Sequence, residues 1–140
     1  MPSVKRPVGI NMTNKEIVDT FVEKMLLKGD LETLGDVLHP DVMINSLTGI
    51  RGRGLEVARR AVQVWRDAFP QVDNQLRTSF ENETHVMHQW RTIAVQKNVF
   101  LGVMPSSETR VFTGVTIYRV HDGKIVEVTG YTDFLVNYSS

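Results

Sequence analysis

A carboxylate and a histidine in the second half of this 140-residue chain are the side chains best suited to move protons. Asp133 sits just past the last predicted strand, among Tyr131, Phe134 and Leu135. An apolar setting of this kind raises the pKa of a carboxyl group and suits it to proton transfer. The alternative role for Asp133 is to cap or ion-pair the C-terminal segment.

His88 is the histidine best placed to reach a cavity. It alternates with Val86 and Trp90 in a predicted strand, and side chains two residues apart share one face of a strand. His85 is three residues away and therefore points to the opposite side. The alternative for His88 is a hydrogen-bonded histidine that fills the core without touching a ligand.

The sequence carries no signature of a metal or cofactor site. Its four histidines lack the helical spacing with an intervening Glu that is typical of zinc enzymes, and there is no cysteine. Neither a phosphate-binding loop, nor a dinucleotide fingerprint, nor a Gly-x-Ser-x-Gly motif is present. We therefore expect no metal and no cofactor, so that any catalysis comes from general acid–base groups and the shape of a pocket.

Composition narrows the class of protein. Sixteen basic and sixteen acidic residues balance, so no basic excess indicates a nucleic-acid surface. No apolar run approaches the ~20 residues that span a bilayer, and the N-terminus lacks the apolar segment of a secretory signal. We expect a soluble, cytoplasmic protein that binds neither nucleic acid nor membrane.

The first half of the chain is predicted to be helical. Residues 1–12 show no periodicity and are predicted to form a flexible arm before a single domain over residues 13–140. Thr13 and Glu16 have the spacing of a capping box at a helix start, and Gly29 is expected to end that helix.

A second and a third helix are expected before any long strand. Asp30 can cap a short helix that Pro40 ends, and residues 55–69 show apolar side chains at steps of three and four. Between these two helices, residues 41–47 read as a short strand or edge segment.

The second half is predicted to consist of antiparallel strands. The clearest pair flanks Asp122-Gly123, a dipeptide that favours a hairpin turn because glycine accepts positive φ at no steric cost. Helices followed by long strands indicate an α+β domain with its helices on one face of a curved sheet.

Residues 109–120 are apolar on both faces, which predicts a partner for the outer one. Phe112, Thr116 and Tyr118 point one way, while Val111, Val115 and Ile117 point the other way. A solvated face should be more polar. We expect a second subunit to cover it, giving a homodimer or higher homo-oligomer, and the alternative is a cover formed by a local segment.

Three segments resemble a known family. They are LHPDV at 38–42, the loop and helix at 50–70, and FLGVMPSSETRVFTGVTIYRVHDGKIVE at 100–127. In this combination they resemble the SnoaL-like polyketide cyclases of the nuclear transport factor 2-like superfamily, and the likeness covers most of residues 13–135.

The resemblance implies a cone-shaped, curved, mixed or antiparallel sheet and three N-terminal helices that enclose a pocket for a flat substrate. It also implies aldol ring closure without metal or cofactor, by an Asp on the last strand and a His on the preceding one. In our alignment these fall on Gly130 and Thr116, so neither catalytic type is retained. Asp133 or His88 would have to supply the proton-transfer group.

The sequence thus leads to two hypotheses about function. The first is a cofactor-free enzyme for ring closure or isomerisation of a hydrophobic, polyketide-like carbonyl compound. Proton abstraction gives an enolate, and Asn45, Trp90 or Tyr118 donates a hydrogen bond to its oxygen.

The second hypothesis is a noncatalytic binding or assembly protein on the same fold. The predicted substrate-binding residues are Met43, Asn45, Trp65, Phe69, Trp90, Phe112, Thr116, Tyr118 and Tyr131.

Overall fold

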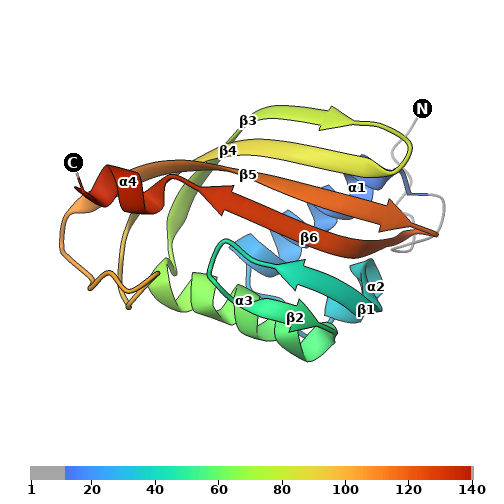
Figure 1. The fold of residues 1–140 in the computed structure, drawn as a ribbon, viewed down its shortest axis with the longest axis horizontal. Helices are drawn as coiled ribbons and strands as arrows, with labels where there is room; N and C mark the ends of the chain where they lie inside the picture. The colour runs from blue at the N-terminus through green and yellow to red at the C-terminus, as the bar shows by residue number, and fades with distance from the viewer. Residues whose placement is uncertain (1–11, 140) are drawn as a thin grey trace.

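A mixed, six-stranded sheet curves around the helices of the first half of the chain, and a short C-terminal helix lies beyond one end of the sheet (Figure 1). The computed structural model describes residues 12–139, and the arm expected over residues 1–12 lies outside the described residues except for Met12. None of the helices between residues 12 and 139 has the length and apolar composition that a bilayer crossing needs.

The helices are α1 (Asn14–Thr20), the π-helix η1 (Phe21–Leu27), α2 (Leu34–Val37), α3 (Leu55–Ala68) and α4 (Phe134–Ser139). The strands are β1 (Leu38–Asn45), β2 (Arg51–Arg53), β3 (Val72–Glu81), β4 (His85–Val95), β5 (Thr109–His121) and β6 (Lys124–Thr132). They lie in the order β2-β1-β6-β5-β4-β3, antiparallel except for the parallel pair β1 and β6.

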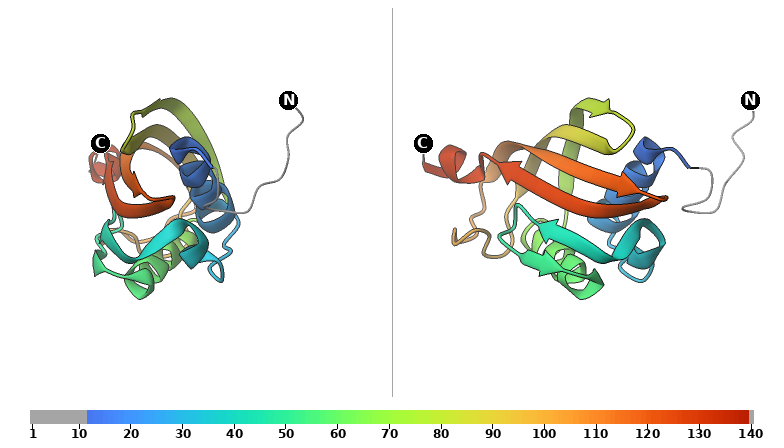
Figure 2. Two further views of the ribbon diagram at one scale, coloured as in Figure 1. Left: turned by 90° about the vertical axis from the view of Figure 1, so that its right-hand side faces the viewer. Right: turned by 45° about the vertical axis from the view of Figure 1, so that its right-hand side comes forward.

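The sheet curls around the helices because its ladders are interrupted. The pairing shifts between Leu76 and Thr78 of β3 and between Arg119 and Val120 of β5. Irregularities of this kind bend a strand and increase its twist. Figure 2 shows the resulting curl, with α1 and α3 on the hollow side.

The predicted capping box at the start of α1 is confirmed. The Glu16 amide donates to Thr13 Oγ1 at 3.1 Å, and the Thr13 amide donates to Glu16 Oε1 at 3.0 Å. The helix continues into η1 without a break, and the segment ends at Gly29, whose φ is +77°.

Arg66 of α3 ties the end of η1 to the third helix. Its Nη1 atom donates to the carbonyl oxygens of Leu26 and Leu27 at 3.1 and 2.7 Å. Glycine suits position 29 because of its positive φ, and a Cβ atom there would lie 2.6 Å from Arg66 Nε and would displace the Arg66 side chain. This contact fixes η1 against α3 across the interior.

The second helix is shorter than the sequence suggests. The helical turn α2 gives way to β1 at Leu38, two positions before the expected stop at Pro40. Pro40 lies in the part of β1 where the ladder to β6 is broken, between the pairs made by Leu38 and Met43. Proline is tolerated there because no ladder hydrogen bond requires its missing N–H.

The predicted hairpin at Asp122-Gly123 is confirmed. Both residues have positive φ, 48° and 78°, between the paired His121 and Lys124. This is the backbone geometry of the turn whose twist matches that of antiparallel strands.

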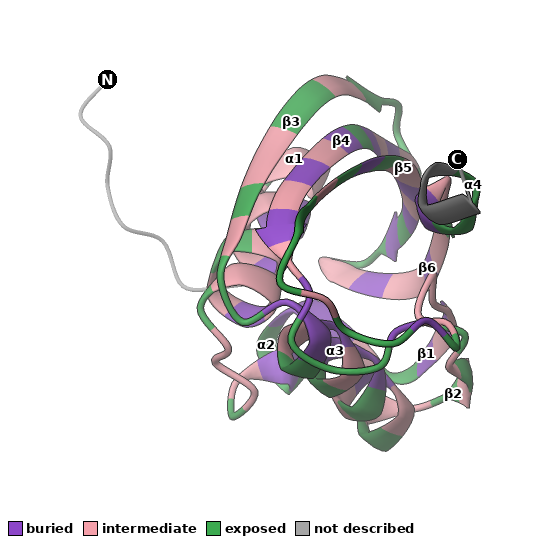
Figure 3. Ribbon diagram, turned by 90° about the vertical axis from the view of Figure 1, so that its left-hand side faces the viewer, coloured by how far each residue is buried: buried purple, intermediate pink, exposed green. Residues whose placement is uncertain are grey.

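The interior holds two clusters of buried apolar side chains, and burial follows the inward faces of β4 and α3 (Figure 3). One cluster packs α1, η1, α2 and α3 against the strands of the sheet. The other is aromatic and includes Trp65, Phe69, Trp90, Phe100, Phe112 and Phe134, with six of its ring pairs between 5.0 and 6.0 Å apart. The rings of the aromatic cluster therefore pack against one another, and Trp65 and Trp90 also border the cavity described below.

We predict that Gly114→Ala destabilises the fold by about 2 kcal/mol, within the usual range for forcing extra atoms into a packed core. A Cβ there would lie 2.2 Å from Trp90 Cζ2 and 2.4 Å from the Tyr131 carbonyl oxygen. Urea unfolding measures the change. Gly35→Ala is the control, because its Cβ would meet Leu55 Cδ1 at an ordinary 3.5 Å. Equal stability of the two variants would contradict the prediction.

Candidate functional site

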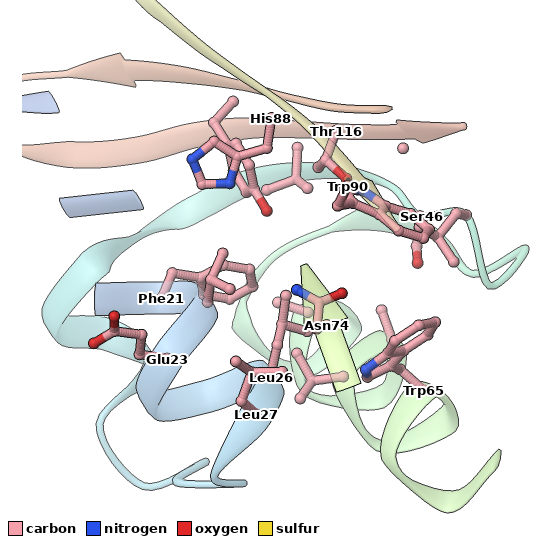
Figure 4. A pocket seen from close by; sticks show the side chains of 18 of the residues that line it. Phe21, Glu23, Leu26, Leu27, Ser46, Trp65, Asn74, His88, Trp90 and Thr116 are labelled. Atoms are coloured by element: carbon pink, nitrogen blue, oxygen red, sulfur yellow. Dashed lines mark hydrogen bonds between the residues drawn. The ribbon is translucent and has the colours of Figure 1, made fainter. Parts of the chain in front are cut away.

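A cavity of about 400 Å³ lies between the helices and the concave face of the sheet (Figure 4). Its helical wall is Lys15, Asp19, Phe21, Val22, Glu23, Leu26, Leu27, Ala58, Ala61, Val62 and Trp65. Its other lining residues are Ile44, Ser46, Leu47, Thr48, Asn74, Leu76, His88, Trp90, Thr116, Tyr118, Val128 and Gly130. The lining is mainly apolar with a few polar groups, which is typical of a small-molecule site.

The π-helix supplies much of the helical wall. Five of its residues line the cavity: Phe21, Val22, Glu23, Leu26 and Leu27. Its backbone departs from α-helical pairing, since the Lys28 amide bonds to the Glu23 carbonyl oxygen at 3.2 Å. Segments of π-helix occur often at functional sites.

The sheet wall carries a row of three positions across neighbouring strands. His88 of β4 pairs with Thr116 of β5, and Thr116 pairs with Gly130 of β6. All three line the cavity. The Trp90 Nε1 atom donates to Thr116 Oγ1 at 3.0 Å, and the Thr116 hydroxyl is in turn a hydrogen-bond partner of Tyr118.

His88 is buried and has an unsatisfied nitrogen. Only 5% of the residue is exposed, and its Nε2 atom has no hydrogen-bond partner. Asp19 Oδ1 lies 3.5 Å from Nε2. Burial lowers the pKa of His88 below its usual value; the carboxylate of Asp19 opposes this shift and the charge of Lys15 adds to it. At neutral pH the ring is therefore uncharged and able to accept a proton.

Tyr118 stands beside His88 as a hydroxyl that keeps its proton. The two rings lie edge to face with centroids 5.6 Å apart. Burial raises the pKa of Tyr118 well above its usual value, although a hydrogen bond with Thr116 opposes the shift. The Tyr118 hydroxyl is thus available as a donor to an oxygen in the cavity.

Asp133 lies outside the cavity. Its Oδ1 atom accepts from the Thr113 amide and its Oδ2 atom accepts from Thr113 Oγ1, both at 2.7 Å. These bonds anchor the segment between β6 and α4 to β5. The anchoring role, which the sequence left open as the alternative, agrees with this placement.

The other predicted site residues divide into three groups. Trp65, Trp90, Thr116 and Tyr118 line the cavity together with His88. Phe69 and Phe112 do not line the cavity; they pack within the aromatic cluster, Phe69 against Phe100 and Phe134, and Phe112 against Phe134. Met43, Asn45 and Tyr131 do not line the cavity.

The reason for this last group is strand alternation. On β1, Val42 and Ile44 are buried, which turns Met43 and Asn45 to the other face. Tyr131 is 62% exposed on the outer face. From β1 and the following loop, Ile44 and Ser46 reach the cavity instead.

Sequence reasoning missed Asp19 and Lys15. Their only signal is the four-residue spacing that joins them in an ion pair on α1, 2.6 Å from Lys15 Nζ to Asp19 Oδ2. Such pairs are usual on solvated helix surfaces, so the spacing alone did not indicate a site. Within residues 12–139, no three His, Asp or Glu side chains gather where they could hold a metal ion.

Comparison with known proteins agrees with this geometry. A family model described as SnoaL-like polyketide cyclase matches residues 16–138. Among curated proteins none matches the chain. Solved structures share the fold, and the three described next are each under 25% identical to this chain.

A candidate SnoaL-like polyketide cyclase from Jannaschia sp. CCS1 superimposes with a TM-score of 0.80 at 22% identity, over 98% of this chain and 95% of that chain. A SnoaL-like polyketide cyclase from Agrobacterium tumefaciens gives 0.78 at 17% identity, over 91% and 96%. The candidate polyketide cyclase IdmH from Streptomyces antibioticus gives 0.75 at 21% identity, over 92% and 100%. The nuclear transport factor 2-like fold implied by the resemblance is confirmed.

We predict that burial of His88 makes the fold less stable at acidic pH. Above the usual histidine pKa of about 6.5 the ring is neutral in both the folded and the unfolded state. As pH falls below that value, the unfolded chain binds a proton that folded His88 resists, because its folded pKa is lowered, and stability is lost.

The measurement is urea unfolding at pH 7.5 and pH 5.0. His88→Gln is expected to lose less stability than the wild type across this interval. The control is His121→Gln, whose parent side chain is 72% exposed. An unchanged pH dependence in His88→Gln would contradict the prediction.

Proposed function

This chain belongs to the SnoaL-like polyketide cyclase family, and we propose that it is an acid–base enzyme acting on a flat, hydrophobic, polyketide-like carbonyl compound. The reaction is ring closure or isomerisation within the cavity. The observation that carries the proposal is a neutral, buried His88 with an unsatisfied nitrogen at the wall of an apolar cavity. A buried titratable group whose pKa is shifted and that lies at a cleft is a candidate for a catalytic role.

The proposed chemistry begins with proton abstraction. His88 takes a proton from the carbon next to the substrate carbonyl, and the electron pair left behind forms an enolate. The hydroxyl of Tyr118 donates a hydrogen bond to the enolate oxygen, where negative charge develops. The enolate then attacks a second carbonyl to close a ring, and His88 returns its proton to the alkoxide that forms; in an isomerisation, His88 instead returns the proton to another carbon of the enolate.

The cavity suits a substrate of modest size. Its volume of about 400 Å³ lies near the lower end of the ~300–1,000 Å³ typical of small-molecule sites. Trp65 and Trp90 meet edge to face at 6.2 Å and form the apolar boundary against which a flat ring can pack.

A noncatalytic binding protein is the second candidate, and one observation favours it. Thr116 and Gly130 stand where our alignment places the His and Asp of the family. A Cβ atom at Gly130 would lie 3.2 Å from both the Cβ and the amide nitrogen of Leu47, so Leu47 occupies the space beside that position. A carboxylate at residue 130 would not fit without moving Leu47.

We also propose that the outer face of the sheet joins two copies of the chain. Val111 of β5 is 42% exposed, Phe80 of β3 is 64% exposed and Tyr131 of β6 is 62% exposed on that face. Phe80, Met87 and Ile117 form an apolar cross-strand row from β3 to β5 on the same face. Exposed apolar patches of this kind mark interaction surfaces.

We predict that light scattering at micromolar concentration gives a mass of twice the monomer or more. Ile117→Lys places a charge at the centre of the patch and is expected to give monomers that still unfold cooperatively. Arg119→Lys, on the same strand and close to the patch, is the charge-conserving control. A wild-type mass equal to the monomer would contradict the dimer.

For the reaction, we predict that the protein speeds loss of deuterium from C1 of deuterated 2-tetralone, a flat hydrophobic ketone, above the rate in buffer. His88→Ala should lower this rate about 100-fold, the lower range for losing a general base. NMR follows the exchange. His85→Ala, on the opposite face of β4, is the matched control.

The variant Asp133→Asn distinguishes Asp133 from His88 as the proton-transfer group. Because Asp133 lies outside the cavity, we expect this variant to keep the wild-type exchange rate. Full activity in His88→Ala would contradict the proposed mechanism. Binding of 2-tetralone by the wild type without any exchange would support the noncatalytic candidate instead.

A further inference from the structure

Two charged residues of α1, Lys15 and Asp19, line the cavity next to His88. Lys15 Nζ lies 2.6 Å from Asp19 Oδ2, while the other carboxylate oxygen, Oδ1, lies 3.5 Å from His88 Nε2. Each oxygen of the carboxylate therefore faces one partner. The three side chains form a line from the surface of α1 to the cavity wall on β4.

The carboxylate of Asp19 is held in place on this line. The capping box made by Thr13 and Glu16 fixes the first turn of α1. The bond from Lys15 anchors Oδ2, and Asp19 is only partly exposed, with 34% of its side chain accessible. Oδ1 is thus directed at the buried imidazole.

We propose that Asp19 is a positioning residue for proton transfer by His88: it fixes the proton of the neutral ring on Nε2 and leaves Nδ1 as the base that faces the substrate. This assignment deepens the proposed function and rests on it. Nothing in the family resemblance assigns a role to a helix α1 carboxylate here.

The chemistry of the two groups supports this assignment. A neutral imidazole carries its proton on one nitrogen only, and an ionised carboxylate can only accept. Facing Asp19, Nε2 is stabilised as the N–H donor, so the free lone pair falls on Nδ1. Figure 4 shows the His88 ring entering the cavity from β4 with one nitrogen turned toward the interior, on the side of Phe21 and Asn74.

The distance fits a site without substrate. At 3.5 Å, Nε2 and Oδ1 make no hydrogen bond, and Nε2 stays unsatisfied. Catalytic hydrogen bonds are often long in the free enzyme and shorten in the complex. When Nδ1 takes the substrate proton, the ring becomes imidazolium and the enolate keeps the electron pair. The new positive charge then lies beside the Asp19 carboxylate, which itself stays unprotonated.

Neighbouring groups affect how readily the His88 ring is protonated. Lys15 on α1 disfavours the protonated ring, and Asp19 favours it. Tyr118 on β5 contacts the ring and stays protonated because its pKa is raised. The hydrogen bond that Lys15 donates to Asp19 raises the pKa of Lys15, and the charges of Glu81 on β3 and Glu23 on η1 raise it further.

The first test is the ring ¹⁵N NMR spectrum of His88, titrated with pH. In the wild type we expect the neutral ring to carry its proton on Nε2. Asp19→Asn is expected to lower the His88 pKa, because a favourable charge is lost, and to populate the Nδ1–H form, because an amide can donate to Nε2. The control is Asp67→Asn, the same change on the exposed side of α3, where Asp67 accepts from Gln63.

The second test is the pH profile of C1-deuterium exchange from 2-tetralone. The rate should rise with pH through the His88 pKa, since only the neutral ring accepts a proton. Asp19→Asn is expected to move this rise to lower pH and to reduce the plateau rate at least tenfold, with little change in KM. A purely structural role would lower the amount of folded protein without moving the profile.

The outcomes separate this inference from the proposed function. An Nδ1–H ring in the wild type, or an unchanged His88 ring and exchange profile in Asp19→Asn, would overturn the role of Asp19 alone. Exchange that survives His88→Ala would overturn the base itself. If Asp19→Asn fails to fold, Lys15→Met replaces it as the test variant. In Lys15→Met the pKa of His88 should rise, because the positive charge of Lys15 is lost, and the neutral His88 ring should keep its proton on Nε2. A His88 ring protonated on Nδ1 in this variant would overturn the inference.

Discussion

The antiparallel register of β4, β5 and β6 is the constraint on which the site depends. It sets His88, Thr116 and Gly130 side by side on the concave face, and a shift of one residue in either ladder would turn that row outward. Two features hold the register. The Asp122-Gly123 turn fixes β5 against β6, and the close contact of Trp90 with Gly114 fixes β4 against β5.

The same row explains how this chain differs from the pattern of its family. With threonine and glycine at the two positions where our alignment places the acid–base pair, the remaining titratable group of the row is His88 on the next strand. Leu47 packs over Gly130, and the polar partner of His88 comes from the helix on the other side of the cavity. In the proposed function, the group that transfers the proton therefore lies on β4, beside α1, and not on β5 or β6.

Much of the fold was accessible from sequence because local chemistry determined it. The capping box at Thr13, the hairpin turn and the inward face of β4 each follow from residue types at fixed spacing. The site was only partly accessible. The sequence predicts that Met43 and Asn45 line the cavity, but alternation on β1 turns them away from it. The irregular pairing at the start of β1 means that the sequence alone does not show which of its residues face inward.

Two further differences arise from packing between distant segments. Phe69 and Phe112 are apolar and inward, as a ligand-binding residue would be, but whether they meet a ligand or each other depends on Phe100 and Phe134. Asp19 resembles any helix-surface carboxylate until β4 is folded against α1. Such tertiary contacts between separate elements leave no periodic signal in a single sequence.

The central claim is that the cavity beside His88 binds a flat carbonyl compound. The most direct measurement adds 2-naphthol, a planar and stable enol, to isotopically labelled protein and maps the chemical-shift changes. The account predicts the largest changes at the indole groups of Trp65 and Trp90 and at the His88 ring. Changes confined to the outer face around Phe80 and Ile117, or no saturable change at all, would contradict it.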